Sequence, residues 1–334
     1  METYLEIPHR RAHGLCPVNG IRGLVQWRTQ RNWSNEFVWG LGQGGGFAYL
    51  RFKSAKPPRQ LYTGIATPRQ HRYLADLLQA KFMEVEKRSY KFSWQKAQEA
   101  LDAGNPPILG PLDMYFLHFY QDLYHQRHIP IHFLLMVGYD EEKVYVLDTD
   151  MDDVQTIPLE ELQLAWDVNV PGIGKQNRLA VLDIPRELPP DRDLICQAIQ
   201  DQCQSMLHPP VALVGIPAMR KIAGEVVRWK EELGEEVARQ CLRQTREYLN
   251  SPPDLEGNHL TAGCDIYVTF LEEAAQMAEL NLTPAIDLLN DAIAIIPKLS
   301  SAIQNDKLEQ AAAYFHRWAD IEEQTYTYLQ QAVS

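Results

Sequence analysis

Apolar residues in the first part of the chain follow two different spacings. After Cys16, residues Val18, Ile21 and Val25 recur at intervals of three and four, which predicts a helix with one buried face. Other segments alternate between apolar and polar residues, as strands do. We therefore expect helices near residues 16–30, 68–79 and 93–103, with Ser93 as the N-cap of the third, and strands, or the end of a strand, near residues 47–52 and 113–117.

Two later apolar runs give the clearest strand signal. Ile131–Gly138 and Lys143–Asp148 are joined by a short segment at residues 139–142, which is typical of a β-hairpin. In the first run, the residues that would lie on both faces are apolar. This pattern favours an interior strand that is covered on both sides.

A charged segment rich in proline, at residues 185–193, predicts a linker. Beyond it the apolar spacing is helical, and Thr283 followed by Pro284 is typical of a helix start. We therefore expect an α+β domain over residues 1–185 and an all-helical domain over residues 186–334. The expected helices of the second domain cover residues 191–206, 216–233, 237–249, 264–280, 284–299 and 305–331.

Composition narrows the function classes. The 334 residues include 32 Lys and Arg against 44 Asp and Glu, so the net charge is −12. This charge argues against nucleic acid as a partner, whereas a small cationic substrate is compatible with it. The longest apolar runs have only strand length, so we expect no membrane span. Five scattered cysteines, with no zinc-type spacing, indicate a reduced cytoplasmic protein without a bound metal or other cofactor.

Cys16 is the candidate nucleophile. Pro17 is favoured at the first position of a helix, which would place Cys16 at the N-cap. There the helix dipole favours a thiolate, and the free backbone amides at the helix start are suited to an oxyanion. The amide of Cys16 is the first oxyanion candidate, and Asn19 is a weaker one.

His132 and Asp148 are the candidate partners of this thiol. Across a hairpin centred near residues 140–141, His132 would fall opposite Asp148 or one residue away from it. Opposed residues share a face, so Asp148 would hold the imidazole and fix its tautomer. Cysteine, histidine and carboxylate are the parts of a thiol nucleophile site. Two plainer interpretations stay open: a buried structural cysteine, and a structural hydrogen bond between His132 and Asp148.

Two other patterns have plainer explanations. Gly40, Gly42 and Gly45 match GxGxxG, but the segment precedes a strand pattern rather than a helix, so a tight turn is favoured over dinucleotide binding. The stretch at residues 115–128 is rich in histidine and aromatic residues, and a partly aromatic surface loop is favoured over a metal site. Asp113 and Tyr115, at its start, remain candidate substrate or oxyanion contacts.

The order of several segments resembles a known family. Cys16 is followed by residues 37–42, 113–117, 132–140 and 144–148 in a sequence that resembles the N-terminal domain of the butirosin biosynthesis protein H family. Residues 263–273 resemble the helical domain of unknown function that often follows it. The resemblance implies a papain-like cysteine proteinase fold, in which an N-terminal helix packs on an antiparallel sheet. It also implies Cys16 as nucleophile, His132 as base and Asp148 as the orienting carboxylate.

The family's namesake is an acyltransferase that moves an aminoacyl group from an acyl carrier protein thioester to an aminoglycoside amine. The leading hypothesis for this chain is therefore acyl transfer through a Cys16 thioester to a small-molecule amine. An acyl carrier protein, received near Lys81–Arg88, and self-association through the helical domain remain open as partners. A cysteine peptidase or amidase with the same three residues, and a non-catalytic scaffold with a vestigial site, are the alternatives.

Overall fold

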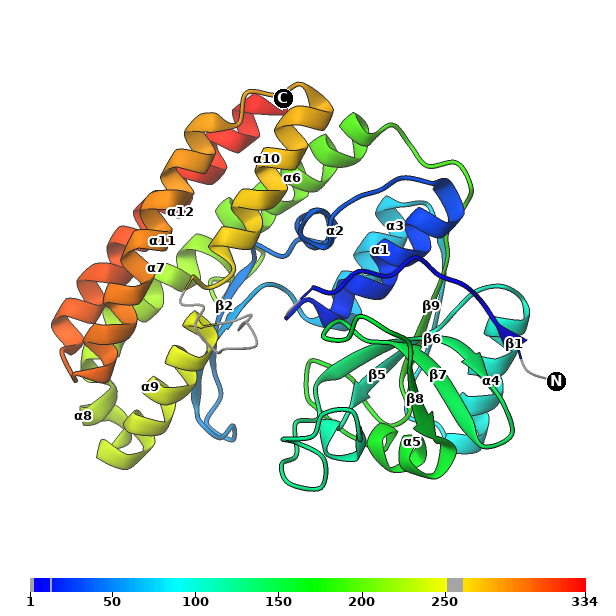
Figure 1. Cartoon of the computed structure of the whole chain (residues 1–334). Coiled ribbons are helices and arrows are strands. Elements are labelled where there is room, and N and C mark those ends of the chain that lie inside the picture. The colour runs from blue at the N-terminus through cyan, green and yellow to red at the C-terminus, as the bar shows by residue number, and fades with distance from the viewer. Residues whose placement is uncertain (1–2, 13, 251–260) are drawn as a thin grey trace. The chain divides into compact units, whose positions relative to one another are not determined.

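The computed structural model describes residues 3–12, 14–250 and 261–334, except for the side chain of Asn19. These residues form two compact units (Figure 1). The sheet unit consists of the chain up to Val38 together with Ala66–Pro189, and the helical unit consists of Trp39–Ile65 and Pro190–Ser334. The expected division near residue 185 assigns residues 39–65 to the N-terminal domain, whereas the structure groups them with the helical unit.

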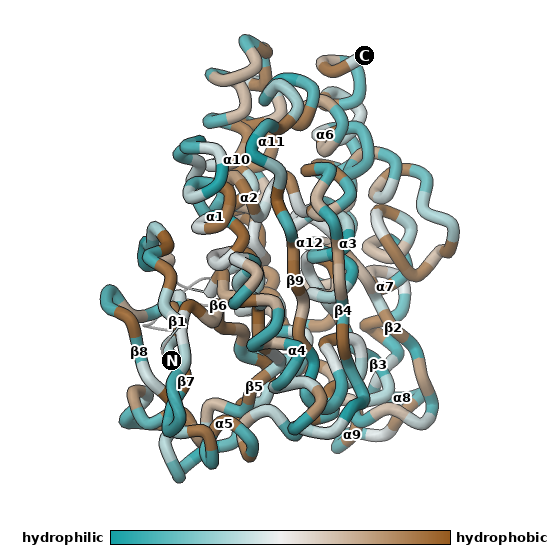
Figure 2. The backbone as a smooth tube through the Cα atoms, turned by 90° about the vertical axis from the view of Figure 1, so that its right-hand side faces the viewer, coloured by the Kyte–Doolittle hydropathy of each residue, from teal (hydrophilic) through white to brown (hydrophobic). Residues whose placement is uncertain are grey.

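The described part of the sheet unit contains one antiparallel sheet of seven strands in the order β4-β9-β5-β6-β7-β8, with β1 also paired to β6. The apolar character of the central strands is visible in Figure 2, for example along β9. The strands are β1 (Thr3–Tyr4), β4 (Lys81–Val85), β5 (Ile108–Leu112), β6 (His132–Tyr139), β7 (Lys143–Leu147), β8 (Gln155–Pro158) and β9 (Leu179–Asp183).

The predicted hairpin is present as β6 and β7, and β6 is an interior strand between β5 and β7. Its register differs from the expected one, because Tyr139 pairs with Val144 next to the turn and a β-bulge between Met136 and Gly138 then shifts the pairing by one residue. Leu135 pairs with Leu147, so a continued register would place Asp148 opposite Leu134 rather than opposite His132. His132 and Asp148 therefore lie on one face as diagonal neighbours, a separation that long side chains still bridge.

Helices cover both faces of this sheet. On one face α1 (Cys16–Thr29) packs against β6, and a Cβ at Gly20 would lie 3.2 Å from the Leu135 Cβ. On the other face, Leu134 and Met136 join a buried apolar cluster with residues of α4 (Tyr90–Asp102) and α5 (Leu159–Trp166). The expected α+β class, with an N-terminal helix on an antiparallel sheet, is confirmed by this arrangement.

Two local predictions need correction. Ser93 is buried inside α4, and the N-cap is Ser89, whose Oγ accepts a hydrogen bond from the Phe92 amide. The residues from Asp113 onward do not continue a strand, because β5 ends at Leu112 and Met114–Phe116 form a 3₁₀ turn. Ser89 satisfies one of the free amides of the first helical turn, which explains why the helix begins four residues earlier than expected.

The helical unit contains the helices expected from the apolar spacing. The expected helix over residues 216–233 is divided into α7, a 3₁₀ turn and α8. In Figure 1, α11 and α12 run side by side along their length. The helices are α6 (Asp191–Leu207), α7 (Gly215–Glu225), α8 (Trp229–Leu233), α9 (Glu235–Leu249), α10 (Cys264–Ala278), α11 (Thr283–Gln304) and α12 (Leu308–Ala332).

Residues 39–65 belong to this unit through direct contacts. They include the end of α2 (Asn35–Leu41) and the hairpin of β2 (Phe47–Arg51) and β3 (Arg59–Thr63). The backbone of Leu61 exchanges two hydrogen bonds with the Gln244 side chain of α9, at 2.9 and 2.7 Å. Gly40 also lies where a Cβ would be 2.1 Å from the Phe270 ring of α10. Close packing, rather than a bound dinucleotide, accounts for this glycine.

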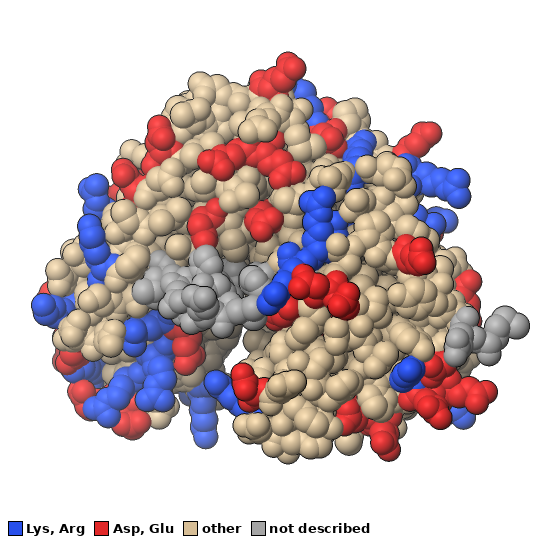
Figure 3. Space-filling view, viewed as in Figure 1, with Lys and Arg blue, Asp and Glu red and all other residues tan. Residues whose placement is uncertain are grey.

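The distribution of charged side chains and the hydropathy of the helices can be compared with the expectations from composition. On the face shown in Figure 3, Lys and Arg are interspersed with Asp and Glu and do not form a continuous basic stripe. Within the described ranges, none of the helices is both long enough and apolar enough to cross a membrane.

Candidate functional site

Cys16 is the first residue of α1. The N-cap is Leu15, so Cys16 lies one position further into the helix than the sequence predicts, with Pro17 after it in the first turn. Leu15 is buried, whereas Cys16 is half-buried, so the helix is anchored while its thiol stays accessible. The start of a helix is favourable for negative charge because its first amides are not used within the helix.

His132 and Asp148 form a buried pair at the ends of β6 and β7. Nε2 of His132 lies 2.8 Å from Oδ2 of Asp148. Burial disfavours the charged imidazole, but the Asp148 carboxylate and then the Cys16 side chain outweigh burial, and together they raise the pKa of His132 well above its usual value. Burial also opposes the ionisation of Asp148, but His132 lowers the pKa of this carboxyl overall.

The Cys16 side chain lies close enough to His132 to raise the pKa of the imidazole by a side-chain hydrogen bond and by its charge. Nε2 of His132 faces the carboxylate, so Nδ1 is the ring nitrogen left for the thiol. The structure thus brings together the three residues of the predicted triad, all within the sheet unit.

Two further residues at this site escaped the sequence analysis. The hydroxyl of Tyr120 lies 3.2 Å from Nε2 of His132, 2.8 Å from Oδ1 of Asp148 and 2.9 Å from Oδ2 of Asp150. The Asp150 amide also donates to Oδ1 of Asp148 at 2.9 Å. The pair of carboxylates two residues apart at a strand end was a usable signal for Asp150. Tyr120 lies in an irregular loop and gave no periodic signal.

A buried histidine supports the start of α1. His71 of α3 (Thr67–Leu77) is fully buried, and its Nε2 lies 2.7 Å from the Pro17 carbonyl oxygen. A carbonyl only accepts, so Nε2 carries the proton and Nδ1 faces Arg178, a pure donor, at 3.5 Å. Burial, followed by the Arg178 charge, lowers the pKa of His71 to about 3. This neutral imidazole holds the backbone next to Cys16.

The remaining predicted contacts have other surroundings. Oδ1 of Asp113 accepts from the amides of Tyr115 and Ile129, and Oδ2 lies 2.6 Å from Nδ1 of His128. The Tyr115 ring stacks on His128 with centroids 4.1 Å apart. These contacts are made within the loop before β6, and they hold that loop in place. Asn19 lies in α1, and its side chain is outside the described part of the structure.

The expected aromatic loop is also present. His125 stacks on Tyr124 with ring centroids 4.0 Å apart, as His128 does on Tyr115. Among the residues that the structure describes, no group of three or more His, Cys, Asp or Glu side chains is arranged to hold a metal ion.

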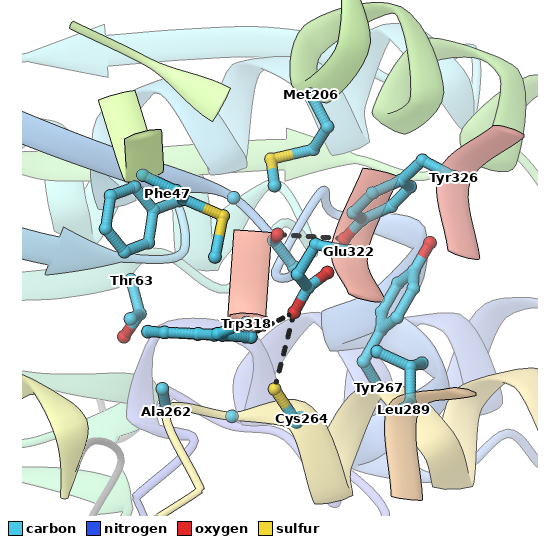
Figure 4. Close-up of a pocket in the computed structure, with 14 residues that line it drawn as sticks. Phe47, Thr63, Met206, Ala262, Cys264, Tyr267, Leu289, Trp318, Glu322 and Tyr326 are labelled. Carbon is cyan, nitrogen blue, oxygen red and sulfur yellow. Dashed lines mark hydrogen bonds between the residues drawn. The ribbon is translucent and has the colours of Figure 1, made fainter. Parts of the chain in front are cut away.

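A separate small cavity lies inside the helical unit (Figure 4). It offers about 20 Å³ to the centre of a water molecule, which is room for one water. Oε1 of the buried Glu322 accepts from Nε1 of Trp318 at 2.8 Å and from the Cys264 thiol at 3.7 Å. Burial raises the pKa of Glu322 to about 7. The cavity is lined by residues of the helical unit alone, so it is not part of the Cys16 site.

Comparison with known proteins agrees with the predicted resemblance. Residues 15–149 match the family model described as butirosin biosynthesis protein H, N-terminal, and residues 160–251 match a domain of unknown function, DUF4872. The second match ends before residues 263–273, the segment that suggested that domain in the sequence. None of the curated proteins matches the chain.

One solved structure that is similar to the chain is described as a putative C39-like peptidase from Bacillus anthracis. It is 15% identical, with a TM-score of 0.37, and the match covers 54% of this chain and 97% of that one. The two family matches, in this order, confirm that the chain belongs to the butirosin biosynthesis protein H-like family, with the family's N-terminal domain followed by DUF4872.

Proposed function

We propose that the protein is a thiol-dependent acyltransferase with a papain-like site. The observation that carries the proposal is the contact of one half-buried thiol, Cys16, with an imidazole whose other nitrogen is held by a buried carboxylate, Asp148. The raised pKa of His132 supports a proton on the imidazole near neutral pH, and an imidazolium at this position would stabilise a thiolate of Cys16 during the reaction. Membership in the family adds independent support for this chemistry.

In the first half of the reaction, the Cys16 thiolate attacks the carbonyl carbon of an acyl thioester. The carbonyl π electrons move to oxygen, and backbone amides at the start of α1 stabilise the resulting oxyanion. The oxyanion then collapses, the bond between carbon and the donor sulfur breaks, and imidazolium His132 protonates the departing thiolate. The acyl group is left on Cys16 as a new thioester, and His132 is left neutral.

In the second half, an amine attacks the Cys16 thioester. Neutral His132 takes the proton from the attacking nitrogen, and the carbon–sulfur bond to Cys16 breaks as the amide forms. The products are the amide and a Cys16 thiolate beside an imidazolium, which is the starting state. Asp148 stabilises the imidazolium in both halves and holds its ring so that Nδ1 faces the sulfur.

We propose a small-molecule amine as the acceptor and a carrier-bound thioester as the donor. The net charge of −12 favours a cationic acceptor, and it requires a local basic surface for an acidic carrier protein. The candidate surface is Lys81–Arg88, where three basic side chains stand among two acidic ones. All five cysteines are free thiols, which supports a reducing compartment such as the cytoplasm.

The direct test is intact-mass spectrometry of the protein after incubation with an aminoacyl N-acetylcysteamine thioester. We expect one added acyl group, mapped to Cys16 and absent in Cys16→Ala. Cys196 is the other half-buried cysteine, so Cys196→Ala is a control matched for exposure and should keep the adduct. Adding a primary amine to the isolated adduct should release an amide in preference to the free acid.

Iodoacetamide gives a second measurement that needs no substrate. A thiolate at Cys16 should react much faster near neutral pH than Cys196, which is also half-buried. Equal alkylation rates, together with no acyl adduct, would overturn the enzyme assignment and leave a scaffold. An adduct that is released only to water would replace the transferase with a hydrolase that uses the same residues.

A further inference from the structure

The hydroxyl of Tyr120 lies at the centre of a polar network around the His132–Asp148 pair. It is within 2.9 Å of one oxygen of each of two carboxylates, Asp148 and Asp150, and 3.2 Å from Nε2 of His132. The Tyr120 ring also packs edge-on against the imidazole, with centroids 5.4 Å apart at 85°. Nearby carboxylates and burial both raise the pKa of this phenol, so the hydroxyl keeps its proton.

A phenol has a single proton to donate. It can go to Asp148 or to Asp150, but not to both at once. When Asp148 receives it, part of that carboxylate's charge is neutralised and its attraction for the imidazolium weakens. When Asp150 receives it, Asp148 acts on His132 with its full charge. Tyr120 is thus placed to divide one hydrogen bond between the carboxylate that orients the base and a second, half-exposed carboxylate.

We propose that Tyr120 and Asp150 are positioning residues that set the proton affinity of His132, and through it the share of the Cys16–His132 pair that is present as thiolate and imidazolium. This inference rests on the proposed function, because it assigns these residues a role in the same site. Asp150 supports the imidazolium by its negative charge, and Tyr120 moderates Asp148.

Within the described ranges, the other charged and titratable groups near the network come from three places. Cys16 faces the imidazole from α1, and Asp148 follows β7. His9 contacts the loop through the Met151 carbonyl oxygen at 2.8 Å, and Arg11 lies 3.8 Å from Asp152. These two contacts involve the residues after Asp150 and not the carboxylates of Asp148 and Asp150 that Tyr120 contacts.

The two substitutions should act in opposite directions. Asp150→Asn removes a negative charge and leaves the Tyr120 proton to Asp148, so the pKa of His132 should fall by about one unit. Tyr120→Phe keeps the ring packing but removes the donor from Asp148, so the pKa of His132 should rise while its ring is held less firmly. A purely structural role for either residue predicts no such pair of opposite shifts.

The measurement is a titration of carbon-13-labelled histidine by NMR in the full chain, with the His132 signal assigned by its loss in His132→Gln. The pH profile of Cys16 alkylation by iodoacetamide is recorded in parallel, and its high-pH limb should move with His132. Two controls are matched by location: Asp152→Asn removes an exposed acid from the same loop, and Tyr124→Phe removes a phenol that binds Glu161. Neither should shift the His132 titration.

The outcomes separate this inference from the proposed function. If wild-type Cys16 is selectively alkylated and forms the acyl adduct, but neither variant shifts His132, the positioning role is overturned and the enzyme stands. Equal shifts in Asp150→Asn and Asp152→Asn would also overturn it, because loop charge in general would then be responsible. The NMR titration reads the pKa of His132 even if no acyl transfer occurs, so the network is tested in either case.

Discussion

Acidification should weaken the sheet unit through one residue, His71. Its imidazole is fully buried and faces Arg178, and its pKa is lowered from 6.5 to about 3. In the unfolded chain this histidine regains an ordinary pKa near 6.5. The unfolded state therefore binds a proton that the folded state excludes. The contribution of His71 to the free energy of unfolding is greatest above pH 6.5 and is lost as the pH falls from 6.5 toward 3.

The size of this loss follows from the shift. Each unit of pKa difference is worth about 1.4 kcal/mol, so at pH 4.5, two units below the unfolded pKa, His71 alone should cost about 3 kcal/mol. The complete effect near pH 3 is on the order of 5 kcal/mol. These values are a large part of the stability of an ordinary domain, so a single imidazole would be a main source of acid sensitivity.

His71→Gln isolates the effect. A glutamine amide can donate to the Pro17 carbonyl oxygen and accept from Arg178, as the imidazole does, but it does not titrate. We would measure the opening free energy of the β6 amides by hydrogen exchange at pH 7 and pH 4.5, because these amides report on the sheet unit alone. Wild type should lose about 3 kcal/mol more than the variant between the two pH values. If the opening free energies of wild type and His71→Gln differ by the same amount at pH 7 and at pH 4.5, His71 does not stay neutral in the folded state, and the assignment is refuted.

Two further predictions concern the helical unit. The pKa of Glu322 is raised to about 7 by burial, so its ionisation destabilises the fold as the pH rises from 4.5 through 7. Glu322→Gln should therefore stabilise the unit by about 3 kcal/mol at pH 8 and by little at pH 4, as measured by hydrogen exchange of α12. Gly40→Ala would place a Cβ 2.1 Å from the Phe270 ring and should cost more than 1 kcal/mol in chemical denaturation, roughly as other overpacked sites do. Gly224→Ala in α7 meets no atom within 4 Å and should stabilise slightly, so a loss as large as that of Gly40→Ala would contradict the packing argument.

The hairpin of β6 and β7 could be predicted from the sequence because two apolar runs across a short polar segment have few other folds. The sequence left Asp148 opposite His132 or one residue away from it, and only the first of these registers places both residues on one face. The register did not follow, because it depends both on the pairing of Tyr139 with Val144 at the turn and on the bulge after Met136, which adds one residue to one strand only. No pattern of apolar and polar residues marks that insertion, and the diagonal placement of Asp148 is visible only in the structure.

The division of the chain shows a different limit. The helices of the helical unit could be placed from apolar spacing, because each of them is long and buries one face. Residues 39–65 could not be assigned to that unit, because a reading along the chain treats a domain as one continuous segment. These residues are held in the helical unit by individual contacts with residues far away in the sequence, such as the hydrogen bonds between Leu61 and Gln244.

The contacts that hold the backbone beside Cys16 could not be predicted from the sequence at all. His71 and Arg178 are polar residues with no exposed surface, which elementary patterning assigns to the outside of a protein. Burying such a pair is costly unless every donor and acceptor is used, and here Arg178 also reaches Glu84 at 2.9 Å and the Gly110 carbonyl oxygen at 3.3 Å. The network links the backbone next to Cys16 with β5, the strand beside His132. We infer that the buried His71–Arg178 pair is retained because it fixes the geometry between the Cys16 thiol and the His132 imidazole. Local sequence rules do not encode a requirement of this kind.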